Sequence, residues 1–378
     1  MSAAPAVPLP RYGDAALADL MPSVAAGLGV PGYTDVLGLG RLSRVCVLLI
    51  DGLGWRLLHR YSGQAPYLSS ALPGARFVTA GFPSTTAASL GSIGTGLAPG
   101  GHGILGYRLA VPGTDRLINS LRWDDGVDPY EWQPHRTVLE NAAADGVAVT
   151  HAAPGAFRGS GLTVAALRGP AYAPAETAGD VVARVVAALS GDERALCLAY
   201  HADLDKIGHL RGCRSAAWRY ELGQVDRLVE QLAAALPPGR TLIVTADHGM
   251  VDVDADRRLD GETEPALTDG VRAIGGEPRA RYVYPLQGAA DDVLAAWREV
   301  LGDRMWVLTR EQAVADGWFG PAVDPAVLDR VGAVVAAAHG DVAVTASRSE
   351  PIESTLPGLH GSLTADEQLV PLVVIGGS

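Results

Sequence analysis

The 378-residue sequence contains little lysine, few cysteines and no long apolar run. Lys206 is the one lysine among 30 basic residues, and 42 acidic residues give a net charge of −12. This acidic balance argues against binding to nucleic-acid polymers or anionic membranes. The three cysteines show no paired spacing, which excludes a disulfide framework and favours a reducing compartment. No run approaches the ~20 apolar residues of a membrane span, and no signal peptide is recognisable, so we expect a cytoplasmic protein.

Four short apolar runs predict buried strands. They are VCVLLI at 45–50, LCLAY at 196–200, TLIVTA at 241–246 and VPLVVIG at 370–376. Their apolar residues are continuous, which is typical of strands covered on both faces of a parallel sheet. Amphipathic helical patterns at 181–189 and 216–236 fall between them. This alternation predicts an α/β fold, a three-layer α/β/α sandwich with a doubly wound, mostly parallel sheet.

Two segments interrupt this pattern. Residues 252–345 begin with an acidic stretch rich in glycine and proline and then resume an α+β pattern. The elements expected there are strands at 282–286 and 305–309 and helices at 290–301 and near 325–338. We interpret 252–345 as an inserted α+β cap subdomain and residues 1–251 and 346–378 as the core. The stretch 107–135, rich in tryptophan, aspartate and proline, indicates a smaller insertion near the site.

Acidic residues and histidines follow three of the four runs directly. Asp51 follows the first, Asp205 and His209 follow the second, and Asp247 and His248 follow the third. Ligands bind beyond the carboxyl ends of the strands in an open α/β sheet, so we expect these segments to meet at one edge. Each alone has an ordinary explanation as a turn residue, helix cap or ion pair. Together, carboxylates and imidazoles suit zinc or manganese, and two such ions would clamp a transferring phosphoryl group.

The segment at 81–107 places three hydroxyls, Ser84, Thr85 and Thr86, before a short apolar helix at 87–93. The simplest interpretation is an ordinary helix N-cap preceded by proline. The same geometry also suits a phosphate site, because free amides and the positive end of the helix dipole face the hydroxyls. A metal ion there would lower the pKa of a hydroxyl and make it a nucleophile.

The order of these motifs resembles the alkaline phosphatase superfamily and, within it, the nucleotide pyrophosphatase/phosphodiesterase branch. The motifs that carry the resemblance are the strand into Asp51-Gly52, FPSTT with TGLAPGGHGI, YHADLDKIGH, TADHGM and a late LHG. The resemblance implies an alkaline phosphatase-like fold. It also implies a metal-dependent phosphoric ester hydrolase, a phosphodiesterase or nucleotide pyrophosphatase that acts on small phosphodiesters or pyrophosphates through a phosphothreonine intermediate.

The resemblance also implies a role for each matched residue. Thr86 corresponds to the nucleophile, since it lies nine residues before Thr95 of the TGL element, and Thr85 is the fallback. One divalent ion, metal A, would be held by Asp51, Thr86, Asp247 and His248. The second, metal B, would be held by Asp205, His209 and His360. Zinc is the expected ion at both sites, and manganese is the alternative.

Some positions depart from the pattern of the branch. Tyr107 stands where the branch has an asparagine that donates to a phosphoryl oxygen, so its phenol is the candidate donor. Leu204 replaces a proline. Lys206 lies between two expected metal ligands and is a candidate charge near the phosphate, with chance placement as the alternative. A phosphomonoesterase, phosphonate hydrolase or phosphomutase of the same superfamily, or a metal-free sensor or scaffold, stays open. The expected partner is a small phosphate ester, and the oligomeric state is left open.

Overall fold

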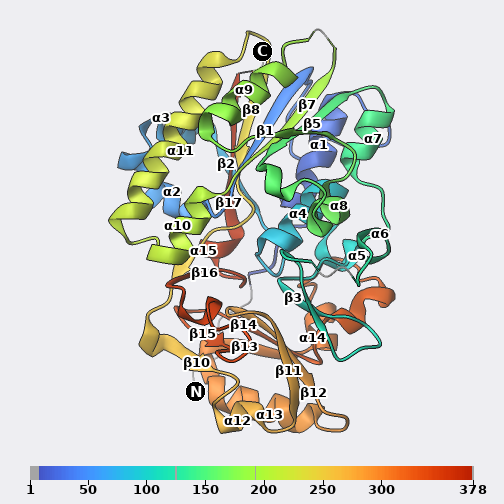
Figure 1. Ribbon diagram of the computed structural model, residues 1–378, viewed down its shortest axis with the longest axis vertical. Helices are drawn as coiled ribbons and strands as arrows, with labels where there is room; N and C mark the ends of the chain where they lie inside the picture. The colour runs from blue at the N-terminus through green and yellow to red at the C-terminus, as the bar shows by residue number, and fades with distance from the viewer. Residues whose placement is uncertain (1–7, 124–125, 192, 377–378) are drawn as a thin grey trace.

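The computed structural model describes residues 8–123, 126–191 and 193–376. Residues 1–7 and 377–378 of the expected core and 124–125 of the expected insertion lie outside the described residues. A seven-stranded sheet in the order β2–β17–β8–β1–β7–β5–β6 forms the centre of the larger part of the molecule (Figure 1). Its strands are β1 (Arg44–Ile50), β2 (Arg76–Thr79), β5 (Ala148–Ala153), β6 (Ala171–Pro174), β7 (Ala195–His201), β8 (Thr241–Thr245) and β17 (Leu369–Gly376).

The sheet is mostly parallel, as the sequence predicts. β1 pairs in parallel with β7 and β8, and β5 pairs in parallel with β6 and β7. β17 is the exception, because it runs antiparallel to both of its neighbours, β2 and β8. The chain enters β17 from the edge where the other strands end, after passing through a second, smaller sheet. The apolar run at 370–376 is therefore a strand as expected, but it runs in the opposite direction.

Helices cover both faces of this sheet and complete the expected three layers (Figure 1). One layer contains α2 (Trp55–Arg60), α3 (Pro66–Ala71), α9 (Ala178–Ala188), α10 (Asp203–Arg211) and α11 (Ala216–Ala235). The other contains α1 (Leu20–Gly27), α4 (Thr86–Thr95), α7 (Val138–Ala144) and α8 (Gly161–Leu167), with α5 (Pro99–His102) following α4. The expected helices at 181–189 and 216–236 correspond to α9 and α11.

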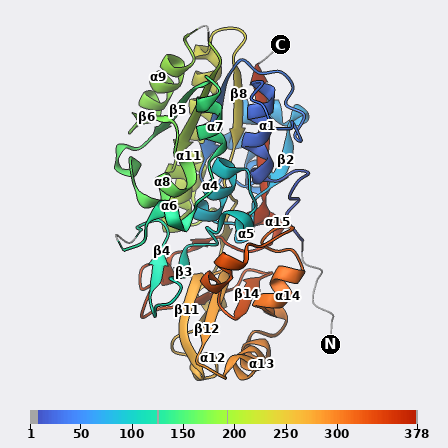
Figure 2. The ribbon, with the colours of Figure 1, turned by 90° about the vertical axis from the view of Figure 1, so that its right-hand side faces the viewer.

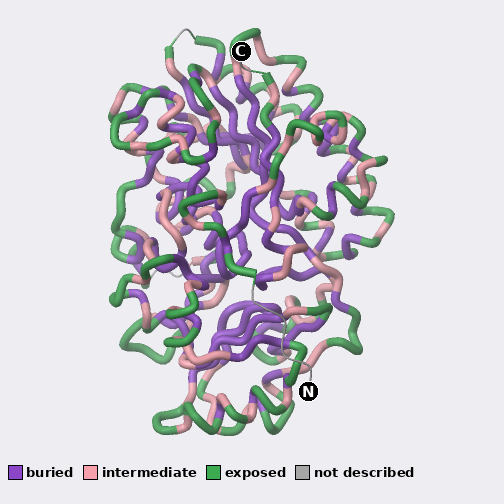
Figure 3. Tube along the Cα trace, turned by 180° about the vertical axis from the view of Figure 1, so that it is seen from behind, coloured by how far each residue is buried: buried purple, intermediate pink, exposed green. Residues whose placement is uncertain are grey.

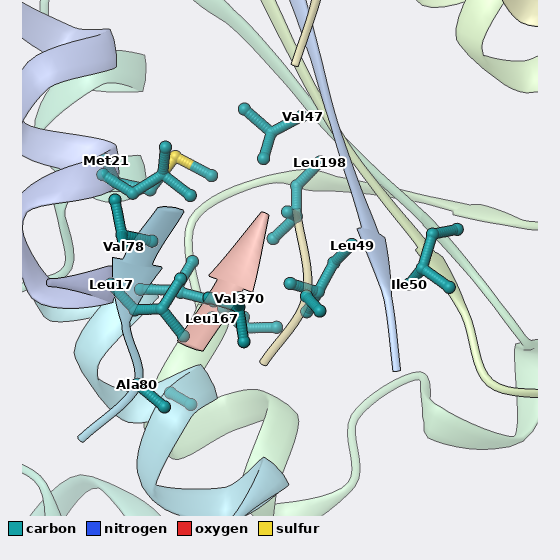
Figure 4. Packing of buried hydrophobic residues seen from close by; sticks show 14 of the residues in the cluster. Leu17, Met21, Val47, Leu49, Ile50, Val78, Ala80, Leu167, Leu198 and Val370 are labelled. Atoms are coloured by element: carbon teal, nitrogen blue, oxygen red, sulfur yellow. The ribbon is translucent and has the colours of Figure 1, made fainter. Parts of the chain in front are cut away.

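Side chains from both faces of β1 are completely buried, which explains why its apolar residues are continuous. Val47 and Leu49 project toward the helical layer that carries Leu17 and Met21, whereas Ile50 points to the opposite face (Figure 4). All five side chains are at most 1% exposed. Burial of each stabilises the fold by roughly 1.5–3 kcal/mol, so strands in this position exclude polar residues on either face.

A second, four-stranded antiparallel sheet in the order β11–β12–β14–β13 lies beyond the carboxyl ends of the main strands (Figure 2). It consists of β11 (Val271–Glu277), β12 (Ala280–Pro285), β13 (Met305–Thr309) and β14 (Val334–Ala338). Around it lie α12 (Pro265–Thr268), α13 (Ala290–Leu301), α14 (Arg310–Ala315) and the short parallel pair of β10 (Arg258–Asp260) and β15 (Ala343–Thr345). The central strands β12 and β14 of this sheet are largely buried, like the central strands of the main sheet (Figure 3). Side chains such as Val283 and Trp297 form a separate apolar cluster.

One prediction for this region, the helix near 325–338, is wrong. The pattern near 325–338 predicts a helix, but the chain forms a short 3-10 helix at Pro325–Arg330 followed by the strand β14. β14 pairs with β12 on one side and β13 on the other, so VVAAA is buried throughout. A short apolar run carries no periodicity that separates a buried strand from a buried helix. The expected helix at 290–301 and the strands near 282–286 and 305–309 are present as α13, β12 and β13.

The described residues of the stretch 107–135 include a small hairpin and a helical turn. The hairpin pairs β3 (Arg108–Ala110) with β4 (Leu117–Asn119), and the turn is α6 (Pro129–Trp132). β3 packs against β11, so this stretch lies between the two sheets (Figure 2). The remaining short elements are β9 (Val251–Asp252), β16 (Gly358–Leu359) and α15 (Ala365–Gln368). Among the described residues, we find no helix with the length and apolar character needed to cross a membrane.

Candidate active site

The three strands that the sequence links to acids and histidines are neighbours in the sheet. β1 lies between β7 and β8, with Ile50 in register with His201 and Leu49 in register with Thr245. The strands therefore end at one level, and the segments that follow them meet at the same edge, as expected. Asp51 is the first residue after β1, and Asp205 lies in the first turn of α10, just after β7.

A glycine allows these segments to approach closely. Gly52 follows Asp51 with φ of +74°, a left-handed conformation that L side chains rarely adopt. A Cβ atom at this position would lie 3.1 Å from both Cα and Cβ of Asp205. The turn after β1 therefore packs directly against α10, which brings Asp51 and Asp205 to opposite sides of one site.

Asp51, Asp247 and His248 form one group of buried metal-binding side chains. Nε2 of His248 lies 3.4 Å from Oδ1 of Asp51, 3.5 Å from Oδ2 of Asp247 and 3.2 Å from Oγ1 of Thr86. The amides of Gly52 and His248 donate to Oδ1 of Asp247 at 3.2 and 3.1 Å, which fixes that carboxylate and turns its other oxygen toward the group.

Asp205, His209 and His360 form a second group beside the first. Nε2 of His209 lies 3.4 Å from Oδ2 of Asp205 and 3.2 Å from Nε2 of His360. His360 follows β16 and reaches the site from a segment far away in sequence. The two groups adjoin, because the rings of His248 and His360 stack with their centroids 3.5 Å apart.

All three histidines direct the same nitrogen into the site. Nδ1 of His209, His248 and His360 lies 2.8–2.9 Å from the backbone carbonyl oxygens of Gly358, Gly249 and Ser84, respectively. A carbonyl accepts only, so each Nδ1 carries the proton and donates. Each Nε2 is therefore left with a lone pair, which is the form in which histidine binds a metal ion.

The side chains of these two groups are suited to bind divalent cations. Without cations, several of their buried polar atoms lack a hydrogen-bond partner within the described chain. Among the described side chains, Oδ1 of Asp51, Oδ1 of Asp205 and Oδ2 of Asp247 are buried and have no hydrogen-bond partner. Burial and then the charge of Asp247 raise the pKa of Asp51 well above its usual value, and burial also raises the pKa of Asp205. Burial lowers the pKa of His360 well below its usual value. A cation in each group would bind the unpartnered oxygens. It would also bind the lone pairs of His209 and His360, which otherwise face each other.

The amino-terminal end of α4 faces the first group. Thr86 is the first residue of the helix, and Thr85 is its N-cap residue, but within the described chain the Thr85 side chain makes no capping hydrogen bond to the helix. The sequence therefore predicts correctly that a hydroxyl residue occupies the N-cap position. The hydrogen bond expected from an ordinary N-cap side chain is absent at Thr85 in the described part of the chain. Ser84 is already engaged, because its hydroxyl donates to the carbonyl oxygen of Ser362 at 2.7 Å. Thr86 and the free amides of the first turn are left to face a ligand.

A cavity of about 390 Å³ opens from this site. Its polar end includes Asp51, Thr86, Asp205, His209 and His360. Its other walls are largely apolar and come from α4, β7, the turn after β4, the segment 155–167 and the loop after β15. They include Leu90, Leu121, Phe157, Leu162, Leu167, Leu198, Tyr200, Ile352 and Leu356. Lys206 is exposed and also lines the cavity. Lys206 therefore lies at the site, as expected. Its role as a charge near the phosphate stays a prediction.

The expected donor Tyr107 lines the cavity, but its hydroxyl is engaged. It donates to Oε1 of Glu353 at 2.9 Å. Burial and this hydrogen bond raise the pKa of Tyr107 to about 12. The proton that a phosphoryl oxygen would accept is therefore shared with a carboxylate of the loop after β15.

Sequence reasoning missed two side chains at the site. The hydroxyl of Tyr200, near the end of β7, donates to the carboxylate of Asp51; its place just before the YHADLDKIGH histidine could have indicated it. Glu277 of β11 also lines the cavity and is only 4% exposed. No local pattern marks Glu277, because it comes to the site only through the packing of the second sheet.

Comparisons with known proteins identify the family and the fold of the chain. Residues 45–363 match the sequence profile of the family described as type I phosphodiesterase / nucleotide pyrophosphatase. Murine ectonucleotide pyrophosphatase / phosphodiesterase 5 has a similar structure, with a TM-score of 0.71, 20% identity and coverage of 89% of this chain and 88% of that chain.

Phosphonoacetate hydrolase from Sinorhizobium meliloti 1021 is also similar in structure, with a TM-score of 0.67, 20% identity and coverage of 89% of this chain and 91% of that chain. At these identities the two structures establish the shared fold. No curated protein matches the sequence. The family match extends over most of the chain, including all the segments that form the site, and the chain belongs to the type I phosphodiesterase / nucleotide pyrophosphatase family.

Proposed function

We propose that this member of the family hydrolyses small phosphodiesters or pyrophosphates with two divalent metal ions and Thr86 as the nucleophile. The observation that carries the proposal is the pair of adjoining carboxylate–imidazole groups, whose unpartnered oxygens and free Nε2 atoms converge beside Thr86. Such a pair serves phosphoryl transfer in many unrelated enzymes.

Each group supplies the ligands of one ion. Asp51, Thr86, Asp247 and His248 would hold metal A, and Asp205, His209 and His360 would hold metal B. Ions bound there would act as Lewis acids that neutralise charge on the phosphoryl group and lower the pKa of the Thr86 hydroxyl. Imidazole nitrogens mixed with carboxylates favour zinc, and manganese is the alternative.

The residues of the chain then perform the transfer. The Thr86 hydroxyl gives up its proton to solvent, and Oγ1 attacks phosphorus. The ester oxygen leaves on the opposite side and takes up a proton from water, and a phosphothreonine is formed. The amides in the first turn of α4 face the non-bridging oxygens, where negative charge must be stabilised. Water then displaces Thr86 from phosphorus and regenerates the hydroxyl.

The cavity indicates which ester groups fit. Leu90, Leu162, Phe157 and Ile352 supply apolar surface beside the polar end, so we expect an apolar or aromatic group on the phosphodiester to bind there. One murine neighbour is recorded with AMP, and the bacterial neighbour with phosphonoformate. Monoester and phosphonate hydrolysis are therefore the alternatives to compare.

The test uses the purified protein and three chromogenic substrates. Metal analysis is combined with rates on bis(p-nitrophenyl) phosphate, p-nitrophenyl phosphate and a p-nitrophenyl phosphonate ester. We expect the diester to be hydrolysed with the highest kcat/KM and Thr86→Ala to abolish turnover while the bound metal is retained. Thr114→Ala, in an exposed turn, is the matched control. Full activity of Thr86→Ala would remove Thr86 as the nucleophile.

We also propose that the protein works in the cytoplasm. Cys46, Cys197 and Cys213 are all unpaired and buried, which fits a reducing compartment.

A further inference from the structure

A buried carboxyl group of the second sheet lies in the active-site cavity without a full set of partners. Glu277 is the last residue of β11, and the turn that follows brings its side chain into the cavity that contains Thr86 and His360. The side chain is 4% exposed, and its Oε1 has no hydrogen-bond partner among the described residues. The Thr85 hydroxyl donates a hydrogen bond to this carboxyl group. Glu277 is thus held by the residue that precedes the proposed nucleophile, and its Oε1 has no hydrogen-bond partner within the described chain.

Two neighbouring glycines show where the two oxygens lie. A Cβ atom on Gly361, the residue after His360, would lie 3.4 Å from Oε2 of Glu277 and 2.7 Å from its Cγ. A Cβ atom on Gly106 would lie 3.7 Å from Oε1. The unpartnered oxygen is therefore on the side of Gly106 and Tyr107, where the sequence predicts a donor to the phosphoryl group.

That side of the site needs a donor. The Tyr107 hydroxyl is already directed to Glu353. The amides in the first turn of α4 lie on the Thr86 side of the cavity, and the residues that would hold the ions include Thr86 and His360. Glu277 lines the same cavity as Tyr107, and its Oε1 has no hydrogen-bond partner among the described residues.

Burial is the main factor that favours the neutral form of Glu277. Two nearby arginines are each paired with another acid: Arg279 of the turn with Glu367 at 2.7 Å, and Arg281 of β12 with Glu350 at 2.8 Å. The hydrogen bond from Thr85 and the charge of Arg281 lower the pKa of Glu277, whereas the charges of Glu350 and Glu367 raise it. Burial in this setting raises the pKa of Glu277 to about 8. A carboxylic acid kept neutral in this way becomes a hydrogen-bond donor, as in other enzymes that stabilise an oxyanion.

We propose that Glu277 is a catalytic residue whose carboxyl O–H donates a hydrogen bond from Oε1 to a non-bridging oxygen of the phosphoryl group that Thr86 attacks. The inference rests on the proposed function, and it assigns to the second sheet a direct part in the reaction. The proton stays on Glu277 throughout, so this step makes and breaks no covalent bond. The hydrogen bond strengthens as negative charge develops on the oxygen, which lowers the barrier to attack.

The experiment compares two substitutions of Glu277 that differ in whether the new side chain can donate a hydrogen bond. Glu277→Gln keeps the size and a donor but cannot ionise, whereas Glu277→Leu keeps the volume and removes the donor. Each is assayed for kcat and KM on bis(p-nitrophenyl) phosphate across a pH range centred on about 8. Competitive inhibition by inorganic phosphate gives a readout that does not depend on turnover. Glu264→Gln and Glu264→Leu, at an exposed position of the same region, are the matched controls.

The expected result separates the two variants. Glu277→Leu lowers kcat by about 100-fold, the effect of removing one oxyanion donor, and weakens inhibition by phosphate. Glu277→Gln retains most of the activity. The wild type loses kcat as the pH rises through about 8, because Glu277 then gives up the proton that it donates, and Glu277→Gln lacks this loss.

The opposite results overturn the proposal. Glu277 is not a donor if Gln and Leu reduce kcat equally, if neither reduces it, or if the alkaline loss persists in Glu277→Gln. Circular dichroism and metal content of each variant show whether the chain has folded with its site intact. If the wild type hydrolyses diesters and Thr86→Ala abolishes the activity, the proposed function stands whatever Glu277 does, so the two failures are distinguishable.

Discussion

Replacing Arg279 tests how firmly the second sheet is fixed to the main one. Arg279 and Glu367 are 0% exposed, and they are joined by two hydrogen bonds of 2.7 Å. Nη1 of Arg279 also donates to the carbonyl oxygens of Gly340 and Val342 at 2.8 and 2.7 Å. Arg279→Met keeps the length of the side chain but leaves the Glu367 carboxylate buried without its cation. Removing one partner of a buried pair costs about 3–5 kcal/mol.

The expected value is near the lower end of this range. Glu367 keeps two donors, the amide of Ser362 at 3.0 Å and the hydroxyl of Thr364. A loss of about 3 kcal/mol, with an m value of about 3 kcal/mol/M, lowers the midpoint of urea unfolding by about 1 M. Unfolding followed by tryptophan fluorescence measures this shift, and the double variant Arg279→Met/Glu367→Gln should recover part of it.

A surface pair provides the matched control. Arg11 lies 2.5 Å from Asp14, and both side chains are about half exposed or more. Arg11→Met should therefore change the free energy of unfolding by about 1 kcal/mol at most. The reasoning is refuted if Arg279→Met shifts the midpoint no more than Arg11→Met, or if the double variant is less stable than the single one.

Further predictions concern the ions and the cavity. His209→Asn should reduce the bound divalent metal from about two ions to about one per chain in metal analysis, since the Asp51 group keeps its ligands. Gly52→Ala places a Cβ atom 3.1 Å from Asp205 at a positive φ, so it should cost more than ~1 kcal/mol of stability and weaken metal binding, measured by chelator competition. Phe157→Ala should raise KM for phenyl phosphodiesters and leave KM for methyl ones almost unchanged. Lys206→Arg should lower kcat/KM if the lysine acts as a compact charge near the phosphate; unchanged kinetics would support chance placement.

The strands and the ligand-bearing segments could be predicted because their signals are local. VCVLLI and TLIVTA are buried on both faces in β1 and β8, and each run ends directly before residues that meet at the edge of the sheet. The direction of β17 could not be predicted, because a continuous apolar run contains no information on which end of the sheet the chain enters. The sequence also predicts a helix where β14 lies, because five buried residues are too few to show a period.

The substrate cavity could not be predicted from any one segment. Its walls combine Leu90 of α4, Phe157 beyond β5 and Ile352 after β15. The distances among them depend on how the two sheets pack. Glu277 shows this most clearly, because Thr85, which donates a hydrogen bond to it at the site, lies 192 residues earlier in the sequence. In isolation, a glutamate at the end of an exposed-looking hairpin is typical of a solvated turn.

The place at which the second sheet is inserted links specificity to the ligands. The chain leaves the main sheet just after Asp247 and His248 and returns through the loop that carries His360. Both connections therefore begin or end at an expected metal ligand, and the Arg279–Glu367 pair fixes the β11–β12 turn to the helix that follows His360. A rigid link at this point lets the second sheet present Glu277 to the phosphoryl group without adding a residue to either metal group. Changes elsewhere in this sheet can then alter the ester group accepted while the ligands keep their geometry.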